Sequence, residues 1–457
     1  MTDTSRLIDE ATPHVQDDES VQENAVDHAA TAPAPVVMDS SAAPGGGYSA
    51  VDAPIGGGAA AGEARTAQHG LFEHSHGAGS PVPDQSRAER RTSFHVADFV
   101  LPTGREEEWR FTPLDLLHGL LDDAPSDEGA AHLTVDAPGA VVGVLAPGQA
   151  PRGTVLVPAD RAAVVASAGT PEGLHVQIPA DAELAEPVRV TLRGADGLRG
   201  NTHVVIEAGR HSRAIVVLDH VGSGRHTGNV EIVTGDGSNL TVVSLQRWQD
   251  DAVHLGQHDA LVGRDARFKH VAVSLGGKVV RLNTNVRYAG PGGDATLLGV
   301  YFADAGQHLE HRSFVDHEPA RCTSLVTYKG ALQGDTARTV WVGDVLIRAS
   351  AEGTQTYELN RNLVLTDGGR ADSVPNLEIE TGQIEGAGHA SATGRFDDEQ
   401  LFYLQARGIP EVEARRLVVR GFFADVVAQI GVPDVQELLM AAIEDELAGA
   451  MVNGARA

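Results

Sequence analysis

The sequence contains a single cysteine, Cys322, and this scarcity limits the cofactors that the chain could hold by itself. One thiol excludes a disulfide framework, a four-cysteine zinc site and an iron–sulfur cluster ligated only by cysteines of this chain. Basic residues are also few, because 35 Lys and Arg stand against 63 Asp and Glu, which gives a formal net charge of −28. A nucleic-acid-binding protein needs a basic surface, so the charge balance argues against that class.

Long apolar runs and targeting signals are likewise missing. No run of about 18 apolar residues occurs, so we predict no transmembrane helix. The first residues, Met1–Arg6, do not join a basic start to an apolar segment, which argues against a secretory signal and favours a cytoplasmic protein. A Walker-type phosphate loop, a Rossmann fingerprint and a nucleophile elbow are absent too, which favours a scaffold or complex subunit over a stand-alone enzyme.

Composition divides the 457 residues into four regions. Residues 1–65 are rich in Ala, Pro, Gly and acidic residues, and we predict that this leader is disordered because it offers little apolar area to bury. Residues 66–130 are predicted to be helical or mixed, with a short helix over Ser86–Phe99. A β-rich core is expected over 131–395, and the remaining residues, 396–457, are expected to be helical.

Glycine turns recur along the β-rich core. Similar segments, each with a glycine, one or two polar residues, a small residue and then an apolar run, begin at Gly235, Gly263, Gly292, Gly334 and Gly368. Repeats at roughly 25–40 residues without intervening helices favour the stacked coils of a β-solenoid. A β-sandwich remains an alternative, but this many strands would have to divide into two domains.

Helical signals return at the C-terminus. One helix is expected between the acids at Asp397 and the glycine Gly408, a second opens at Pro410, and a third covers Pro433–Leu447. Apolar residues recur at every fourth position of the second helix, at Val418, Phe422, Val426 and Ile430. Such a stripe is either a core-packing face or a docking face for a partner.

The densest run of histidines and carboxylates contains His308, His311 and His317. On a helix the first two would share a face and suggest a metal pair, but the surroundings are strand-like, and residues three apart in a strand point to opposite faces. We therefore predict a solvent-facing polar strand and no metal. Cys322, with no histidine close by, is interpreted as a small packed hydrophobic residue.

Two further candidates for chemistry lie near the end of the β-rich core. Glu378 and Glu380 would lie on one face of a strand about 6.6 Å apart, a spacing that could serve acid–base chemistry on sugars or simply form an outward polar face. His389 lies among small residues only, so its imidazole should be approachable, although a turn histidine without a role would look the same.

Three segments resemble a known family. Residues Val374–Glu380 and Gly388–Ile409 resemble the C-terminal signature of the SufB/SufD family of iron–sulfur cluster assembly proteins, and Glu107–Leu114 resembles its N-terminal motif. The resemblance implies a right-handed parallel β-helix with helical N- and C-terminal regions, in agreement with the solenoid expected from the turns. It also implies a cytosolic complex of SufB, SufD and two copies of the ATPase SufC, on which a cluster is built.

Within this family, the sequence is more similar to SufD than to SufB. SufB-like proteins carry a cysteine in the loop before the Val-Pro motif, where sulfur is received, whereas the corresponding loop here, Thr366–Ser373, has none. His389 matches a SufD histidine that is implicated in cluster assembly at the interface with SufB. The resemblance therefore implies that His389 contributes a ligand to iron or to a nascent cluster, opposite a SufB cysteine.

Cofactor and partner expectations follow from the same resemblance. The chain should bind no cofactor stably by itself, and should hold iron or an iron–sulfur cluster only transiently in the complex. Its expected partners are a SufB-like paralogue and a SufC-like ATPase, the latter docked at Val418, Phe422 and Val426, and a homodimer is also possible. The alternative to a non-catalytic scaffold is a polysaccharide-active β-helix enzyme that uses Glu378 and Glu380.

Overall fold

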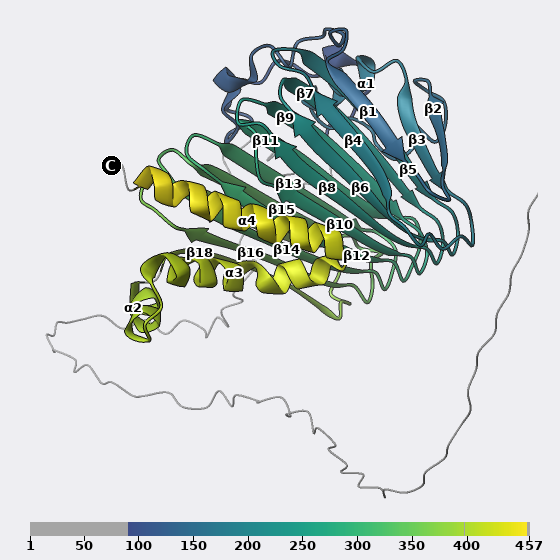
Figure 1. Ribbon diagram of the computed structural model, residues 1–457. Coiled ribbons are helices and arrows are strands. Elements are labelled where there is room, and N and C mark those ends of the chain that lie inside the picture. Colours follow the sequence, from purple (N-terminus) through teal and green to yellow (C-terminus); the bar gives the residue numbers. More distant parts are fainter. Residues whose placement is uncertain (1–89, 397, 455–457) are drawn as a thin grey trace, which may run out of the picture. The chain divides into compact units, whose positions relative to one another are not determined.

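Strands of a parallel β-helix make up most of the computed structural model, which describes residues 90–396 and 398–454 (Figure 1). Within these residues, 18 strands form two nine-stranded sheets, and each coil of the chain adds one strand to each sheet. We call them sheet A and sheet B. The predicted solenoid is therefore confirmed, and the alternative of two sandwich domains is wrong.

The even-numbered strands from β4 onward belong to sheet A together with β1. Their bounds are β1 Ala131–Asp136, β4 Val188–Gly194, β6 Arg213–Gly222, β8 Asn239–Trp248, β10 Arg267–Ser274, β12 Asp294–Ala303, β14 Thr323–Leu332, β16 Gln355–Val364 and β18 Gly386–Arg395.

The odd-numbered strands from β3 onward belong to sheet B together with β2. Their bounds are β2 Val141–Leu145, β3 Gly173–Ile178, β5 Arg199–Ala208, β7 Arg225–Thr234, β9 Val253–Val262, β11 Val279–Tyr288, β13 His308–His317, β15 Arg338–Ile347 and β17 Arg370–Ile379. All neighbours in both sheets pair in parallel except at the first coil, where β1 on β4 and β2 on β3 are antiparallel.

The repeated glycine turns form corners between coils. Gly334 and Gly368 adopt φ angles of +80° and +88°, which an L side chain would rarely tolerate. The small residue that follows each turn is buried at the corner where coils stack, as at Ala266, Ala295 and Ala337. The recurring glycine and small residue thus arise because closely stacked coils leave little space at their corners, and not because loops prefer polar residues.

Tyrosine and glycine fit together in the interior of the β-helix. Gly330 lies beside Tyr301 in the register of β12 and β14, and Gly299 lies beside Tyr328. A Cβ atom at Gly330 would lie 1.8 Å from the Tyr301 ring, so only glycine leaves room for it. The ring is fixed at its far end too, because its hydroxyl donates to Asn362 Oδ1 at 2.8 Å.

Replacing Gly330 by alanine is therefore expected to lower the free energy of unfolding by about 1–3 kcal/mol, since the Tyr301 ring must leave its place. Gly394→Ala is the matched control, because a Cβ atom there meets no heavy atom within 4 Å. Urea denaturation of both variants tests the expectation. Equal urea midpoints for the two variants would show that the interior can accommodate a methyl group at position 330.

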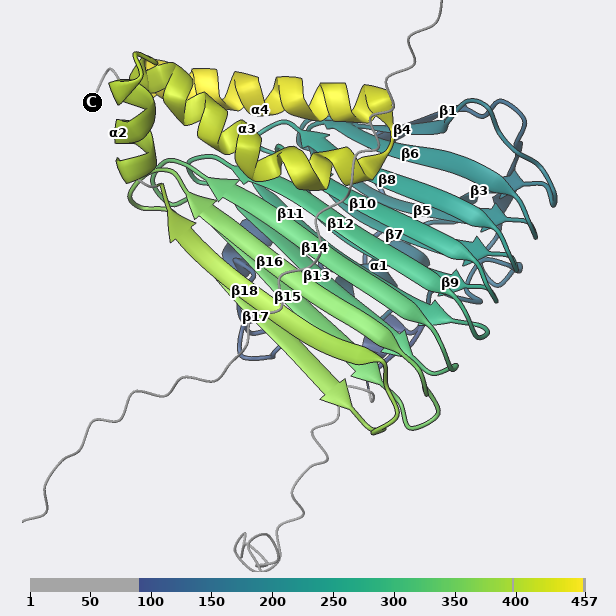
Figure 2. The ribbon, with the colours of Figure 1, turned by 90° about the horizontal axis from the view of Figure 1, so that it is seen from below.

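Three helices follow the last strand: α2 Asp398–Ala406, α3 Glu411–Ile430 and α4 Pro433–Gly454. Helices α3 and α4 lie along the outer face of sheet A (Figures 1 and 2). They bury one apolar layer against strands β6 to β14, with Val419, Phe423, Val426 and Ile430 from α3 and Leu439 and Ile443 from α4. The expected C-terminal helices are confirmed, and α3 packs against its own chain.

The apolar stripe of α3 differs in part from the one expected. Val426 is fully buried, but Val418 and Phe422 are only half-buried, and Val419 and Phe423 occupy the core positions instead. An α-helix has 3.6 residues per turn, so residues chosen at every fourth position move gradually around the helix. Some of them therefore lie at the side of the buried apolar stripe and not at its centre. The structure thus places Val426 inside the protein and leaves Phe422 at the margin of the interface.

Residues 90–130 cross the outer face of sheet B with little regular structure. They contain two 3-10 helices, Val96–Asp98 and Leu114–Leu117, so the helix predicted over Ser86–Phe99 is largely wrong where it is described. The guanidinium of Arg161 donates to the carbonyl oxygens of Val96 and Phe99 and so ties this segment to helix α1 (Arg161–Ala168). The predicted disordered leader, residues 1–65, lies outside the described residues.

One short helix inside the β-rich region was not predicted. Helix α1, Arg161–Ala168, begins at Asp160, whose carboxylate accepts the backbone N–H of Ala163 at 2.9 Å. Its buried alanines and valines pack beneath the N-terminal segment, where Trp109, Leu117 and Leu120 meet sheet B. An eight-residue helix of small side chains gives little periodic signal, so the sequence pattern hid it.

Candidate functional site

The last coil forms one end of the β-helix and leaves that end open. In the described part of the chain no strand follows β17 in sheet B or β18 in sheet A. Most residues of β18 are exposed, among them His389, which lies between Gly388 and Ala390. The imidazole is therefore approachable, as its small neighbours predicted.

His389 belongs to the inward-facing side of β18. It is in register with Glu358 of β16, a side chain that is buried in the interior. Two residues further along the same face, the Ser391 hydroxyl donates to the Ser373 hydroxyl of β17 at 2.7 Å, which shows that this face looks toward sheet B. A cavity of about 310 Å³ at this edge is lined by nine residues, including Pro375, Leu377, Glu378 and His389.

Glu358 is an unusual residue for the interior. Its side chain is 1% exposed, and neither carboxylate oxygen has a hydrogen-bond partner within the described residues. Burial, together with the nearby charge of Asp344, raises the pKa of Glu358 to about 8. The Glu358 carboxyl group is thus mostly neutral at pH 7. It lies on β16, the strand that pairs with the one carrying the exposed His389.

Several polar side chains near Glu358 bond to one another. Asn360 Nδ2 donates to the Tyr301 hydroxyl at 2.9 Å, and Asn362 Nδ2 donates to Asn360 Oδ1 at 2.8 Å. Ser373 Oγ donates to the same Asn360 oxygen at 2.8 Å. This network holds β16 and β17 together and leaves Glu358 outside it.

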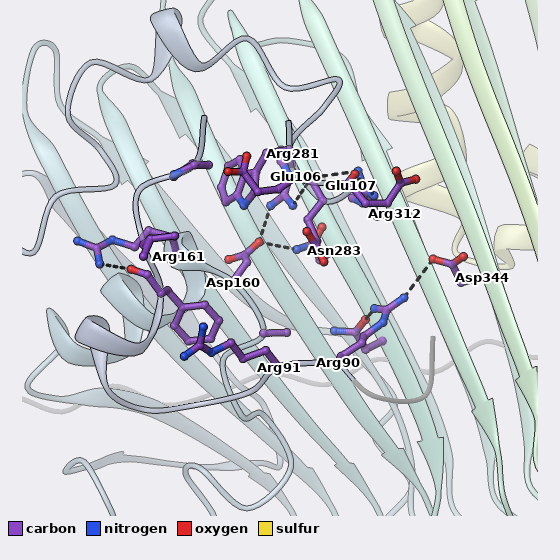
Figure 3. Close-up of a pocket in the computed structure, with 17 residues that line it drawn as sticks. Arg90, Arg91, Glu106, Glu107, Asp160, Arg161, Arg281, Asn283, Arg312 and Asp344 are labelled. Atoms are coloured by element: carbon purple, nitrogen blue, oxygen red, sulfur yellow. Dashed lines mark hydrogen bonds and ion pairs between the residues drawn. The ribbon is translucent and has the colours of Figure 1, made fainter. Parts of the chain in front are cut away.

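A larger cavity of about 840 Å³ lies between the N-terminal segment and the outer face of sheet B (Figure 3). Five arginines and five acidic residues line it, so their formal charges cancel. Arg281 donates to Asp160 at 2.6 Å, and Arg90 donates to Asp344 at 3.1 Å. Since these charges are engaged in holding the segment to the sheet, we do not place the site here.

The solvent-facing strand predicted for His308, His311 and His317 is wrong, because all three side chains are buried. His311 stacks on Tyr301 inside the β-helix, with ring centroids 5.0 Å apart. His308 lies on the outer face of sheet B, where its ring donates a hydrogen bond to Glu310. The N-terminal segment covers His308 and Glu310, and its Thr112 hydroxyl donates to Glu310. A segment 200 residues earlier in the chain provides this cover, which local alternation cannot reveal.

Among the described residues, no group of three or more His, Cys, Asp or Glu side chains is arranged to hold a metal ion. Cys322 is fully buried, as predicted, and burial raises the pKa of its thiol. Glu378 lines the cavity beside His389, while Glu380 follows β17 and accepts the backbone N–H of Ala349 at 3.1 Å. No helix in the described ranges is long and apolar enough to cross a membrane.

An exposed apolar group on α2 and α3 was not predicted as a site. Phe402 and Tyr403 are 71% and 56% exposed, and Val412 and Leu417 on α3 are 46% and 41% exposed. Large apolar side chains gathered on a surface mark interaction sites in soluble proteins. Two adjacent aromatic residues in a chain with 4% aromatics were the sequence signal that could have identified them.

Fold and site together define a parallel β-helix scaffold with one open end, an approachable histidine there, and helices packed on an outer face. Comparison with known proteins gives the family. Residues 191–422 match the model of the SufBD core domain of SUF-system FeS cluster assembly. The chain belongs to the SufBD family of iron–sulfur cluster assembly proteins, which supports a role in SUF iron–sulfur assembly.

Individual relatives agree. An iron–sulfur cluster assembly SufBD family protein of Mycobacterium bovis is 54% identical over 370 residues, which cover 79% of this chain and 93% of that protein. The SufD proteins of Bacillus subtilis and Escherichia coli are 26% and 23% identical. These alignments cover 60% and 76% of this chain, and 63% and 90% of the two SufD proteins.

Proposed function

We propose that this chain is a SufD-like, non-catalytic scaffold subunit of a cytoplasmic SUF assembly complex. Its open end pairs with a SufB-like β-helix, and iron or a nascent cluster is bound at the resulting interface. The observation that carries the proposal is the exposed His389 on the uncovered last coil of a SufBD-family β-helix. The absence of cysteine from Thr366–Ser373 supports SufD over SufB.

The open end can offer two kinds of bonding to such a partner. The outer edges of β17 and β18 present backbone N–H and C=O groups along ten residues each, which a second sheet could pair with. His389 supplies a nitrogen ligand that suits iron. The thiolates of a cluster must come from the partner, because the one thiol of this chain is buried.

His389→Ala in the complex reconstituted with SufB-like and SufC-like chains is expected to lower cluster yield about tenfold or more, in line with the loss of a metal-site residue. His132→Ala is the matched control, since His132 is exposed on β1 at the other edge of the same sheet. Size-exclusion chromatography checks that both complexes form. An unchanged yield with an intact complex would remove His389 from the site.

We propose further that a SufC-like ATPase docks on the C-terminal helices. The exposed group Phe402, Tyr403, Val412 and Leu417, with the half-buried Val418 and Phe422 nearby on α3, supports this surface. Val426 contributes indirectly, because it holds α3 on sheet A.

Phe402→Asp should therefore abolish co-purification of the ATPase while leaving the thermal midpoint of the chain unchanged, since the side chain is exposed. Leu325→Asp is the control, because Leu325 is an exposed apolar residue (37%) on a strand, β14, and not on these helices. Phe422→Asp should weaken capture as well, with circular dichroism to exclude unfolding. Full capture by the Phe402 variant would contradict this docking surface.

A further inference from the structure

A buried carboxyl group without a hydrogen-bond partner requires an explanation. Removing a carboxyl group from water without compensating hydrogen bonds is unfavourable, and native interiors rarely retain such groups. Glu358 is 1% exposed, and both of its oxygens lack a partner among the described residues. Its neighbours Asn360 and Asn362 are bonded into the interior network, so they do not serve it.

The opposite sheet makes room for this carboxyl group. A Cβ atom at Gly343 of β15 would lie 2.3 Å from the Trp341 ring and 2.7 Å from Glu358 Oε1, so glycine at this position leaves room for both side chains. The Glu358 carboxyl group thus packs against β15 in the interior. This packing also keeps the group within the last coils, close to the open end.

His389 is the residue of the next strand that lies in register with Glu358. Glu358 and His389 are register partners on the adjacent parallel strands β16 and β18, so their Cα atoms are about 4.8 Å apart and their side chains point to the same face. A rotation about the side-chain bonds of either residue brings a carboxylate oxygen and an imidazole nitrogen within reach of one ion. This oxygen and nitrogen pair is a donor set that suits divalent iron.

We propose that Glu358 is the second ligand that this chain gives to iron, so that Fe²⁺ arriving at the open end displaces the proton of the Glu358 carboxyl group into solvent and is bound by His389 and Glu358 together. The inference rests on the proposed function and deepens it, because iron is here the cargo of the assembly. Two ligands make half of a site, and the remaining positions are filled by water and by the partner. This division explains why no complete ligand set occurs in the described part of the chain.

Titration of the full chain with Co²⁺ as a probe, followed by its visible absorption, tests the pair. Glu358→Gln and His389→Ala should each raise the dissociation constant about tenfold. Glu380→Gln is the matched control, because Glu380 follows β17 at the same open edge and its loss should leave Co²⁺ binding unchanged. Circular dichroism and thermal midpoints confirm that each variant is folded.

The outcomes separate this inference from the proposed function. If Glu358→Gln binds Co²⁺ like the wild type while His389→Ala does not, the inference is overturned and the role of His389 stands. Equal weakening by the Glu380 control would also overturn it, because the absorption would then report adventitious carboxylates only. No binding of Co²⁺ by the wild-type chain would overturn it as well, because the two side chains would then not form a metal site. If both site variants weaken binding but neither lowers cluster yield in the complex, the metal pair holds and the proposed function fails.

Discussion

Glu310→Ala is expected to lower the free energy of unfolding by about 3–5 kcal/mol, because it leaves buried positive charge without compensation. The Glu310 carboxylate accepts hydrogen bonds from Thr112 at 2.8 Å and from His308 and Arg312 at 3.1 Å, and Arg281 Nε lies 3.5 Å away. Burial opposes ionisation, but the His308 bond and the two arginines hold the pKa of Glu310 well below its usual range. The carboxylate is thus the common partner of this cluster.

Urea denaturation of Glu310→Ala and of a matched surface variant measures this effect. Glu107→Ala is the control, since Glu107 pairs with Arg110 on the surface three residues along and its loss should change stability by less than about 1 kcal/mol. Glu310→Gln should fall between them, because it keeps the shape but not the charge. Similar midpoints for the two alanine variants would mean that water reaches the buried cluster.

The protein is also expected to lose most of its stability between about pH 6.5 and pH 4, because burial lowers the pKa of many histidines. The pKa is lowered to about 4 for His220, His270 and His317, and to about 3 for His311. In the unfolded chain these groups bind protons near pH 6.5. Below that pH the unfolded state therefore holds more protons, and each one destabilises the fold by about 1.4 kcal/mol per pH unit.

Buried carboxyl groups act in the opposite direction but are fewer. Burial raises the pKa of Glu358 to about 8 and that of Asp259 and Glu446 to about 7, so these groups stabilise the fold at low pH and lose that contribution as the pH rises. Three carboxyl groups oppose eight histidines with lowered pKa values. The eight are His203, His220, His226, His254, His258, His270, His311 and His317.

Thermal midpoints measured from pH 7.5 to pH 4.5 test this balance. His311→Phe should flatten the dependence on pH, since phenylalanine keeps the stacking on Tyr301 and cannot take up a proton. His132→Phe on the exposed strand β1 should leave the slope as it is in the wild type. If the two variants show the same slope, proton uptake by buried histidine does not drive the acid transition.

Local signals predicted the β-helix well, because each coil repeats one steric requirement at its corner. The glycine and small residue of each turn are visible in the sequence, and Ala266, Ala295 and Ala337 are buried where coils stack. The exposure of His389 could also be predicted, since its neighbours in the chain are small. These features depend on residues close together in the chain.

What the sequence could not reveal depends on distant partners. His308 looked solvent-facing because the segment that covers it lies near Thr112, about 200 residues earlier. The burial of Glu358 could not be predicted from its own strand, since β15 of the opposite sheet packs against its carboxyl group. The stripe at Val418 and Phe422 was displaced by one position because only packing on sheet A selects the buried flank.

The unequal ends of the β-helix give the molecule a direction. The first coil closes with the short antiparallel strands β1 and β2, of six and five residues, whereas the last coil ends in two ten-residue parallel strands. Stacking of the last coil on the first coil of another molecule would repeat without limit and produce filaments. Because the first coil is finished with short strands of reversed direction, it does not offer the last coil a matching pair of long parallel strands for such head-to-tail stacking.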